Sequence, residues 1–410
     1  MAPIMTTVSQ GAASVSPAKL LNRPPIPAID PSVLTFIAGK RILVTGAGGS
    51  IGSELVRQLL DCQAAEVFAL DHDESALHSL SLHLHGHGLF DDERMILADV
   101  RDGLGLLRIF RLVRPHVVYH AAAHKHLPLL ERYPIEGLKT NVLGTKHAVA
   151  AAIEADAGLF VNISTDKAAR PTSALGVTKR LAEMIVAEHA MRGTRVASVR
   201  FGNVLGSRGS FMDSLTFQIA NDQPVTITDP DVTRFFMTIP EAAGLVIQAS
   251  LLADQGETYV LDMGEPIRIV ELVRRYAILA GIPLPEIRIT GLRVGEKLHE
   301  QLFDGAELTS PTKNGRVWAV TAKQAPPKKL TEQISKIARR SEGRDSLKVL
   351  LELSKLLPDD GTIRHPSRLA PEKRPILPPS WRALRRDERE LNTFMERTDP
   401  DQLVSGYQGP

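Results

Sequence analysis

The chain has 410 residues, of which 43% are hydrophobic and 23% are charged, and its formal net charge is +2. At about 150 residues per domain, this length predicts two or three domains with enough apolar residues for a large core. The near-neutral charge argues against a dedicated nucleic-acid-binding protein, which would concentrate basic residues on one face. Small anionic substrates remain compatible with the composition, because they need only a few well-placed cations.

A single cysteine, Cys62, excludes an internal disulfide and a cysteine zinc site, and with them a disulfide-stapled secreted scaffold. It ends a predicted helix, where a packing role is favoured over that of a nucleophile. No run reaches the roughly 20 apolar residues that a membrane span requires. The N-terminus lacks the basic start and apolar core of a signal peptide, so we expect a cytoplasmic protein.

Taken in chain order, residues 1–36 are proline-rich with little apolar periodicity, which predicts an extended arm that lies on the surface or is partly disordered. From residue 37 to residue 200, short apolar runs alternate with amphipathic stretches. Strands are predicted at 41–46, 66–71, 94–100, 116–122, 158–165 and 195–204, and helices at 50–61, 106–114 and 140–156. Buried strands that alternate with helices predict βαβ units, and therefore a doubly wound α/β parallel sheet.

The remaining sequence changes character twice. Residues 201–320 have shorter strands, more proline and more turns, which predicts a smaller lobe that binds the substrate. The tail, residues 321–410, is first lysine-rich and then proline-rich, with helices predicted at 330–340, 346–357 and 381–397. The tail carries no recognisable chemical motif.

The strongest local signal is the run VTGAGGSIGSEL, in which Gly46, Gly49 and Gly52 follow a predicted strand and open a helix. Glycine is needed there for the tight turn, for close approach of a pyrophosphate and for helix–strand contact. Free N–H groups at the helix start, around Ser50 and Ile51, favour the phosphate charge. The pattern predicts a Rossmann-like dinucleotide-binding site rather than a plain glycine turn.

The strands that follow supply the rest of this predicted site. The second strand ends at Asp71, about 20 residues after the glycines, where an acidic side chain binds the adenosine ribose hydroxyls. Its carboxylate would repel a 2′-phosphate, which favours NAD over NADP. Asp99 and Val100 end the third strand, and we expect them beside the adenine. Ala121 and Ala122 follow the fourth strand, and their small side chains leave room for the cofactor.

Nine motifs occur along the chain in this order: TGAGGSIG, DVRD, HAAAHKHLPLLE, TNVLGT, STDKAARPTSALGVTK, RFGNVLGSRGS, TRFFMTIPEA, YVLDMGEPI and GLRVGEKLHEQL. Together they resemble the extended short-chain dehydrogenase/reductase family. Within it, they resemble the bacterial polysaccharide-biosynthesis branch of UDP-N-acetylglucosamine 4,6-dehydratases. The resemblance covers residues 36–310. Many members of that branch carry N-terminal membrane helices, and this chain resembles only their soluble catalytic part.

The resemblance implies an internal redox cycle on a nucleotide sugar. In that family, NAD takes hydride from C4 of the sugar, and the 4-keto group that forms acidifies the C5 proton. A base removes this proton, the 6-hydroxyl leaves as water, and the hydride returns to C6. The product is a 4-keto-6-deoxy sugar, and NAD stays bound because each turnover regenerates it.

By resemblance, Lys167 is the base at C5 and Asp166 is the acid at O6. A lysine acts as a base only if burial or its neighbours lower its pKa. Lys179 matches the lysine that binds the nicotinamide ribose, but the tyrosine expected four residues before it is Leu175 here. Because leucine exchanges no proton, O4 must be deprotonated by Thr165, by Asp166, by a water held by Lys179, or by no strong base at all.

The phosphates of a UDP-sugar call for arginine or lysine side chains. The family motifs offer Arg234 and Arg293 for the phosphates, Asn203 for the pyrophosphate or sugar, and Glu296 for the uridine ribose. Lys125 and His126 follow the fourth strand, where they are expected to touch the sugar. Histidines also cluster at residues 78–87, but no matching cysteine or carboxylate set accompanies them, so no metal is predicted.

Members of the resembled family commonly pair through two helices per subunit, which form a four-helix bundle. The corresponding helices would be residues 140–156 and a helix that begins near Thr178. The resemblance therefore predicts a homodimer or a larger homo-oligomer.

Three functions stay open from the sequence. The first is a nucleotide-sugar 4,6-dehydratase, the second is a nucleotide-sugar 4-epimerase in which hydride returns to C4, and the third is a catalytically weak NAD-binding protein. The Asp166–Lys167 pair favours the first, since a simple epimerase needs no base at C5. Leu175 is the feature that favours the third.

Overall fold

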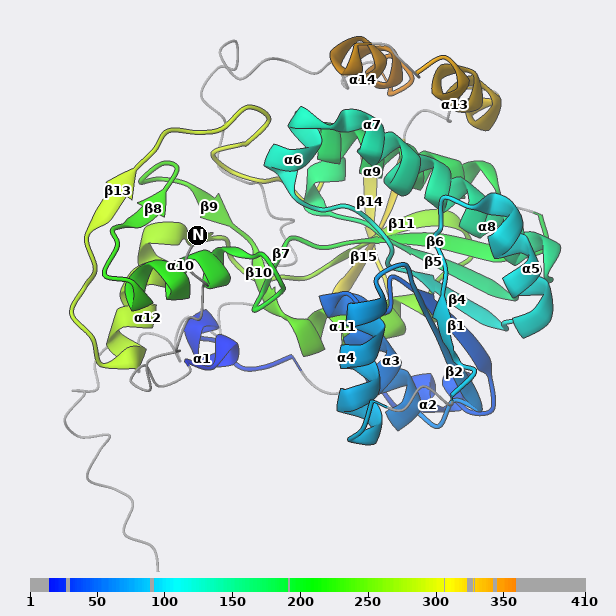
Figure 1. The fold of residues 1–410 in the computed structure, drawn as a ribbon, viewed down its shortest axis with the longest axis horizontal. Coiled ribbons are helices and arrows are strands. Elements are labelled where there is room, and N and C mark those ends of the chain that lie inside the picture. Colours follow the sequence, from blue (N-terminus) through cyan, green and yellow to red (C-terminus); the bar gives the residue numbers. More distant parts are fainter. Residues whose placement is uncertain are drawn as a thin grey trace, which may run out of the picture.

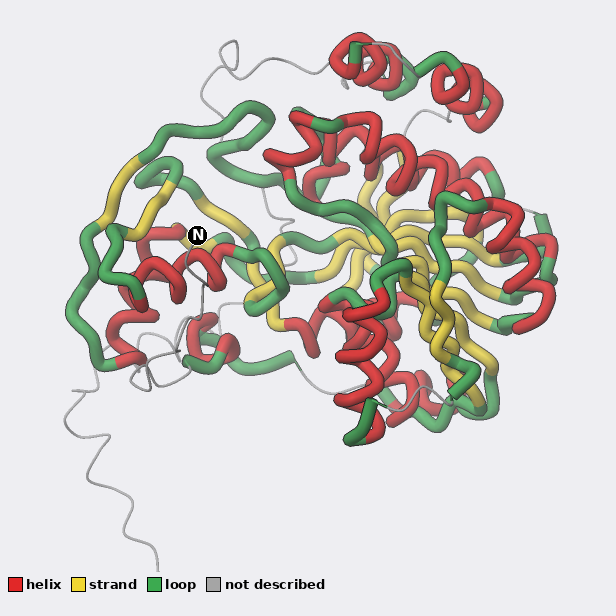
Figure 2. Tube along the Cα trace, in the orientation of Figure 1, coloured by secondary structure: helices red, strands yellow, loops and turns green. Residues whose placement is uncertain are grey.

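The computed structural model describes residues 15–26, 30–88, 92–190, 192–305, 307–322, 327, 329–341 and 345–358. Its centre is a twisted sheet with helices on both faces, drawn in Figure 1 and coloured by element type in Figure 2. The helix predicted at residues 381–397 lies outside the described residues.

The central sheet has nine strands in the order β14-β15-β11-β6-β5-β4-β1-β2-β3. Neighbours from β3 to β11 are parallel, and β15 and β14 add an antiparallel edge. The strands are β1 (Arg41–Thr45), β2 (Glu66–Asp71), β3 (Met95–Leu97), β4 (Val117–His120), β5 (Leu159–Ile163), β6 (Arg195–Arg200), β11 (Gln255–Leu261), β14 (Glu307–Pro311) and β15 (Val317–Ala322). The doubly wound, Rossmann-like sheet predicted from the sequence is confirmed.

Two helical layers cover this sheet and explain its unbroken apolar strands, because both faces are removed from water. One layer contains α2 (Pro31–Ile37), α3 (Ser50–Asp61), α4 (Glu74–His85) and α11 (Ile239–Ser250). The other contains α5 (Gly103–Val113), α6 (Leu127–Arg132), α7 (Pro134–Gly137), the π-helical segment η1 (Leu138–Gly144), α8 (Thr145–Glu154), α9 (Ala174–Glu188), α13 (Leu330–Arg339) and α14 (Ser346–Ser354). Cys62 is buried in the first layer, in the packing role predicted for it.

A smaller lobe has an apolar core of its own. Its elements are α1 (Pro17–Leu21), β7 (Asn203–Leu205), α10 (Phe211–Ala220), β8 (Val225–Ile227), β9 (Thr233–Arg234), β10 (Phe236–Thr238), β12 (Ile267–Arg268), α12 (Ile269–Ala280) and β13 (Ile287–Ile289). The segment predicted as this lobe, residues 201–320, is divided between two places, because α11, β11, β14 and β15 belong to the main sheet. The apolar run of β11 continues the sheet by pairing with β6.

The N-terminal arm is packed against the protein rather than extended on its surface, which corrects the prediction for its described part. Leu20 and Leu21 of α1 are buried in the small lobe, while Val33 and Ile37 of α2 are buried against the main sheet. Between them, Arg23 pairs with Glu241 of α11 at 2.8 Å. Each helix is too short to show apolar periodicity, which explains why the sequence pattern did not reveal them.

A buried ion network joins three elements behind the sheet edge. Arg200 on β6 is fully buried and bonds Glu183 of α9 and Glu307 of β14, each at 2.7 Å. Arg180 adds contacts to both carboxylates, and Glu183 also accepts a hydrogen bond of 2.6 Å from Ser164. Burial raises the pKa of Glu183, but the charges and hydrogen bonds of the arginines outweigh it and bring the pKa to about 2.

Glu183→Gln should destabilise the fold strongly, because Arg200 would stay buried with one carboxylate partner fewer. We expect the free energy of unfolding, measured by urea denaturation, to fall by about 3–5 kcal/mol. The folded-state pKa of Glu183 lies below the ordinary 4.5, so its stabilisation is complete above about pH 4.5 and is lost as the pH falls toward 2.

The matched control is Glu154→Gln, which removes an exposed 2.7 Å pair with Arg111. This variant should cost at most about 1 kcal/mol. Equal losses in the two variants would contradict the importance of the buried network.

Candidate active site

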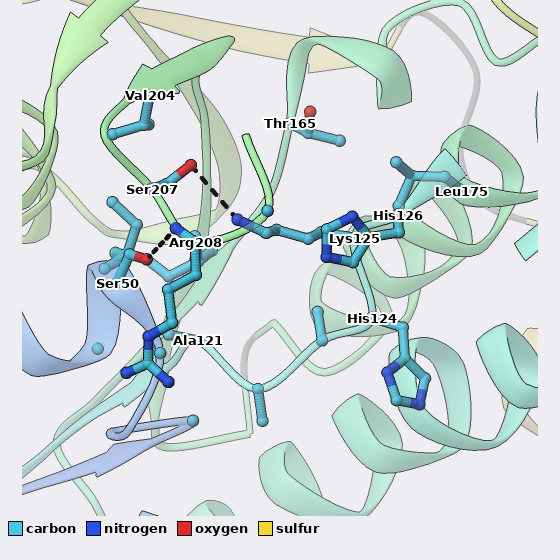
Figure 3. Close-up of a pocket in the computed structure, with 18 of the residues that line it drawn as sticks. Ser50, Ala121, His124, Lys125, His126, Thr165, Leu175, Val204, Ser207 and Arg208 are labelled. Carbon is cyan, nitrogen blue, oxygen red and sulfur yellow. Dashed lines mark hydrogen bonds between the residues drawn. The ribbon is translucent and has the colours of Figure 1, made fainter. Parts of the chain in front are cut away.

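A cavity of about 1010 Å³ opens at the carboxyl ends of the parallel strands, where the small lobe faces the sheet. The loops after β1 to β5 form one wall, as expected for ligand sites in doubly wound sheets. Figure 3 shows side chains that line this cavity, from the segments after β1, β4 and β5 and from the loop after β7. Of the site residues predicted from sequence, all except Asp166 line the cavity.

The glycine turn is shaped for close backbone contact. Gly46 has a φ of +69°, and a Cβ there would lie 2.5 Å from the Ala122 nitrogen. A Cβ on Gly52 would lie 2.1 Å from the Gly46 oxygen, so neither position accepts a side chain. The turn leads into α3, whose N-terminus faces the cavity through Ser50 and Ile51.

Two carboxylates mark the next strand ends. Asp71 is buried, and its Oδ2 accepts a hydrogen bond of 2.9 Å from the Gly48 nitrogen. Asp99 pairs with Arg101 at 2.6 Å and lines the cavity with Val100. A glycine turn, a helix N-terminus and an acidic residue ending β2 together fit a dinucleotide.

The predicted catalytic pair lies at the end of β5. Thr165 Oγ1 donates to Asp166 Oδ1 at 2.9 Å, and Lys167 Nζ contacts the same oxygen at 2.9 Å. Asn203 on β7 accepts from Lys167 at 3.4 Å. The Asp166 carboxylate is fully buried, so it reaches the cavity only through Thr165 and Lys167.

The pKa of Lys167 is not lowered, as a role as a base would require. Burial lowers the pKa of Lys167, but the charges of Asp166 and Glu300 outweigh burial, and the pKa lies above its ordinary value. In the protein without ligand, Lys167 is therefore an ammonium. It can accept a proton from a substrate only after giving up the one it holds.

Leu175 and Lys179 lie one helical turn apart on α9 and both line the cavity. Lys179 Nζ donates to the Ile163 oxygen at 2.5 Å. Burial lowers the pKa of Lys179 to about 8, against the opposing charge of Glu183. The side chain is thus fixed in direction, and it loses its proton near pH 8.

The residues predicted to bind the substrate all line this cavity, but some of them are already paired with other side chains. Arg234 is paired with Glu296 at 3.0 Å and also donates to two backbone carbonyls. Arg293 is exposed at the cavity wall. The pairing shows that Arg234 and Glu296 hold the loop together, which leaves Arg293 as the more available of the two predicted phosphate ligands.

On the opposite wall, Lys125 Nζ donates to Ser207 Oγ at 3.3 Å, and His126 begins α6 (Figure 3). Burial lowers the pKa of both side chains, although the Asp213 charge opposes the shift for Lys125. The backbone nitrogen of Arg208 donates to Ser50 at 3.0 Å, which brings the loop after β7 onto the glycine turn.

Sequence reasoning missed Ser207, Arg208 and Glu300, which all line the cavity. Each lies inside a motif quoted for the resemblance, RFGNVLGSRGS or GLRVGEKLHEQL, so a signal was present. The motif could not show that Glu300 is buried beside Lys167, at 3.7 Å, because the two residues are distant in sequence.

Comparison with known proteins assigns the family. The family described as "Polysaccharide biosynthesis protein" matches residues 42–322, and the chain belongs to it. The probable polysaccharide biosynthesis protein EpsC of Bacillus subtilis is 46% identical over 296 residues, which are 70% of this chain and 49% of EpsC. The UDP-glucose 4-epimerase of Rickettsia rickettsii is 32% identical over 277 residues, which are 66% and 79% of the two chains.

Solved structures are similar over much the same region. Pen from Bacillus thuringiensis is 28% identical with a TM-score of 0.63, covering 70% of this chain and 89% of Pen. MoeE5, crystallised with UDP-glucuronic acid and NAD, is 27% identical with a TM-score of 0.52, covering 62% and 87%. These comparisons confirm the family predicted from the motifs. The chain spans about half the length of EpsC.

Among the residues that the structure describes, no helix is both long and apolar enough to cross a membrane. No group of three or more histidine, cysteine, aspartate or glutamate side chains among them is arranged to hold a metal ion.

The site geometry predicts which dinucleotide the chain retains. Denaturing purified protein should release NAD(H) in near-stoichiometric amount, because the Asp71 carboxylate favours ribose hydroxyls over a 2′-phosphate. Asp71→Ser should retain less NAD, whereas the control Asp61→Asn, which alters an exposed side chain of α3, should retain as much as the unmodified chain. Chromatography of the released nucleotide checks this, and recovery of NADP would contradict it.

Proposed function

We propose that this chain is a nucleotide-sugar 4,6-dehydratase that converts UDP-N-acetylglucosamine into a UDP-4-keto-6-deoxy sugar for surface-polysaccharide synthesis. The observation that carries the proposal is the Asp166–Lys167 pair, held at 2.9 Å, whose Lys167 member lines the same cavity as Lys179. A reaction that removes a C5 proton and a C6 hydroxyl needs two proton-transfer groups together. Membership of a polysaccharide-biosynthesis family supports the same proposal.

The cofactor is NAD, which fits the turn at Gly46 and the carboxylate of Asp71. When bound there, NAD would supply a hydride acceptor for C4 and a hydride donor for C6. The chain supplies a rigid glycine turn for the pyrophosphate and an acceptor for the ribose hydroxyls. We assign the nicotinamide ribose to Lys179, whose Nζ donates to the Ile163 carbonyl.

The substrate's charge is matched by cations on the cavity wall. Arg293 is exposed there, and Lys125 reaches the wall beside Ser207. We assign the two phosphates to these side chains, because arginine and lysine both favour phosphate oxygens. Glu296, with Arg234, orders the loop that closes over the nucleotide end.

The acid and base steps use the single proton that Asp166 and Lys167 share. Without substrate this proton is on Lys167. Its transfer to Asp166 across the 2.9 Å contact gives a neutral amine and a protonated carboxyl. The amine takes the C5 proton. The carboxyl passes its proton through the Thr165 hydroxyl to O6, which leaves as water, and the pair returns to its ammonium–carboxylate form.

The proton on O4 needs another acceptor, because Leu175 occupies the place of a tyrosine. Thr165 lines the cavity and its hydroxyl contacts Asp166, and a water beside Lys179 is the other acceptor in reach of the wall. An ammonium at Lys179 would favour the O4 alkoxide by its charge.

A 4-epimerase is the second candidate function, and the similarity to the Rickettsia rickettsii UDP-glucose 4-epimerase favours it. The two activities differ in what happens at C5. An epimerase leaves the C5 hydrogen in place, whereas the dehydratase exchanges it with solvent and loses water.

The decisive assay incubates the protein with UDP-N-acetylglucosamine in deuterated water and analyses the product by mass spectrometry. We expect loss of water and deuterium at C5. Lys167→Ala and Asp166→Asn should each lower the rate by about 100 to 10,000-fold, since each removes a proton-transfer group. Leu175→Ala should cost far less, because leucine transfers no proton.

The alternative outcomes are distinct. A product of unchanged mass without deuterium at C5 would indicate the epimerase. Full dehydratase activity in Lys167→Ala would show that the loop after β5 is structural and would overturn the assignment of roles.

A further inference from the structure

The helix that carries Lys179 is enclosed from both sides within one chain. Of the 15 residues of α9, 13 are buried. One side packs on β5, β6 and β11, and the other faces η1, α8, α7 and the two C-terminal helices. Figure 1 shows α13 and α14 running along the outer edge of this layer.

The C-terminal helices are amphipathic, and their apolar faces point at this surface. In α13, Leu330, Ile334 and Ile337 recur at helical spacing and are buried. In α14, the buried side chains are Val349, Leu350 and Leu353. All of these belong to the same apolar cluster as Leu181 and Ile185 of α9.

Polar contacts fix the position of α13 as well. The Thr331 nitrogen donates to the Glu188 carboxylate at 3.0 Å, at the end of α9. Lys146 of α8 donates to Ser335 at 2.8 Å. The contact is therefore specific in register and not only apolar.

These helices occupy the surface that the sequence analysis assigned to subunit pairing, formed by residues 140–156 and α9. We propose that α13 and α14 take the place of a second subunit on α9, so that the helical layer is closed within one chain. A partner's bundle helices cannot pack on α9 while α13 and α14 are seated there. The site residues on α9 are then supported by the chain's own C-terminal segment.

The test cross-links the intact chain. A Lys146→Cys/Ser335→Cys double variant, with Cys62→Ser, is treated with a short bismaleimide and analysed by denaturing electrophoresis and peptide mapping. We expect a link within one chain at single-chain mass. A linked dimer would overturn the proposal, because it would place a partner's segment on this surface.

The matched control is the single variant Lys146→Cys with Cys62→Ser, which should give no linked dimer. Dimer formation through this residue would also overturn the proposal, since it would show the surface open to a second copy.

A second experiment removes α13 and α14 from the surface of α9. A chain that ends at residue 322 exposes the apolar residues of α9, and large exposed apolar patches drive association. Light scattering at equal concentration should give a larger mass for this variant than for the full chain. An equal mass with retained helix content by circular dichroism would overturn the proposal.

An independent observation concerns Glu300, which is 2% exposed and lies on the cavity wall. Its Oε1 is 3.7 Å from Lys167 Nζ, and its Oε2 is 3.4 Å from Lys297 Nζ. With Asp166 and Asn203, Glu300 completes a set of acceptors around the Lys167 ammonium, contributed by three separate segments. Burial raises the pKa of Glu300, but the charges of Lys167 and Lys297 outweigh it and bring the pKa to about 2.

We infer that Glu300 is a positioning residue that fixes the direction and charge of Lys167 from the lobe side of the cavity. The role rests on the proposed function for its purpose, but the contact itself can be tested without turnover. A charged carboxylate at this distance stabilises the ammonium, so its removal should make Lys167 easier to deprotonate.

The test follows the ¹⁵N signal of Lys167 Nζ with pH, assigned by its loss in Lys167→Met. In Glu300→Gln the pKa of Lys167 should fall by about 1 or more, and Glu300→Asp should restore part of it. The control Glu271→Gln, at an exposed position on α12, should leave it unchanged. An unchanged Lys167 titration in Glu300→Gln would overturn the assignment, whatever the enzyme's activity proves to be.

Discussion

The architecture depends on one buried set of charges, Arg200 with Glu183 and Glu307. These side chains belong to β6, α9 and β14, which come from distant parts of the sequence. Burying an arginine costs free energy that only good pairing repays, so these elements must meet in a defined register. Because Glu183 also accepts from Ser164, the network sets the loop that carries Thr165 and Asp166. The same buried ion network therefore stabilises both the fold and the loop that carries the candidate site residues.

The local parts of this protein could be predicted from sequence. The strands around the glycine turn are apolar runs, and the turn needs glycine at Gly46 and Gly52 for reasons that the structure makes explicit. Parallel strands bring their carboxyl ends together, which is why residues as far apart as Asp71 and Lys179 line one cavity.

The parts that could not be predicted depend on long-range contacts. The division of residues 201–320 between lobe and sheet follows from β11 pairing with β6, which no local pattern encodes. The charge of Lys167 could not be predicted for the same reason. A sequence shows a lysine next to an aspartate, but not the Glu300 carboxylate that folding brings to it.

The short arm before the sheet contacts both lobes, which limits how they can move relative to each other. It is anchored in the small lobe by Leu20 and on the sheet side by Ile37, with the Arg23–Glu241 pair between these two points. A hinge-like swing of one lobe away from the other would have to separate this part-buried ion pair. A ligand that exchanges without this separation has to pass smaller elements at the cavity wall, such as the loop of Ser207 and Arg208. The lobes, and with them the side chains that line the cavity, then keep their relative placement during the exchange.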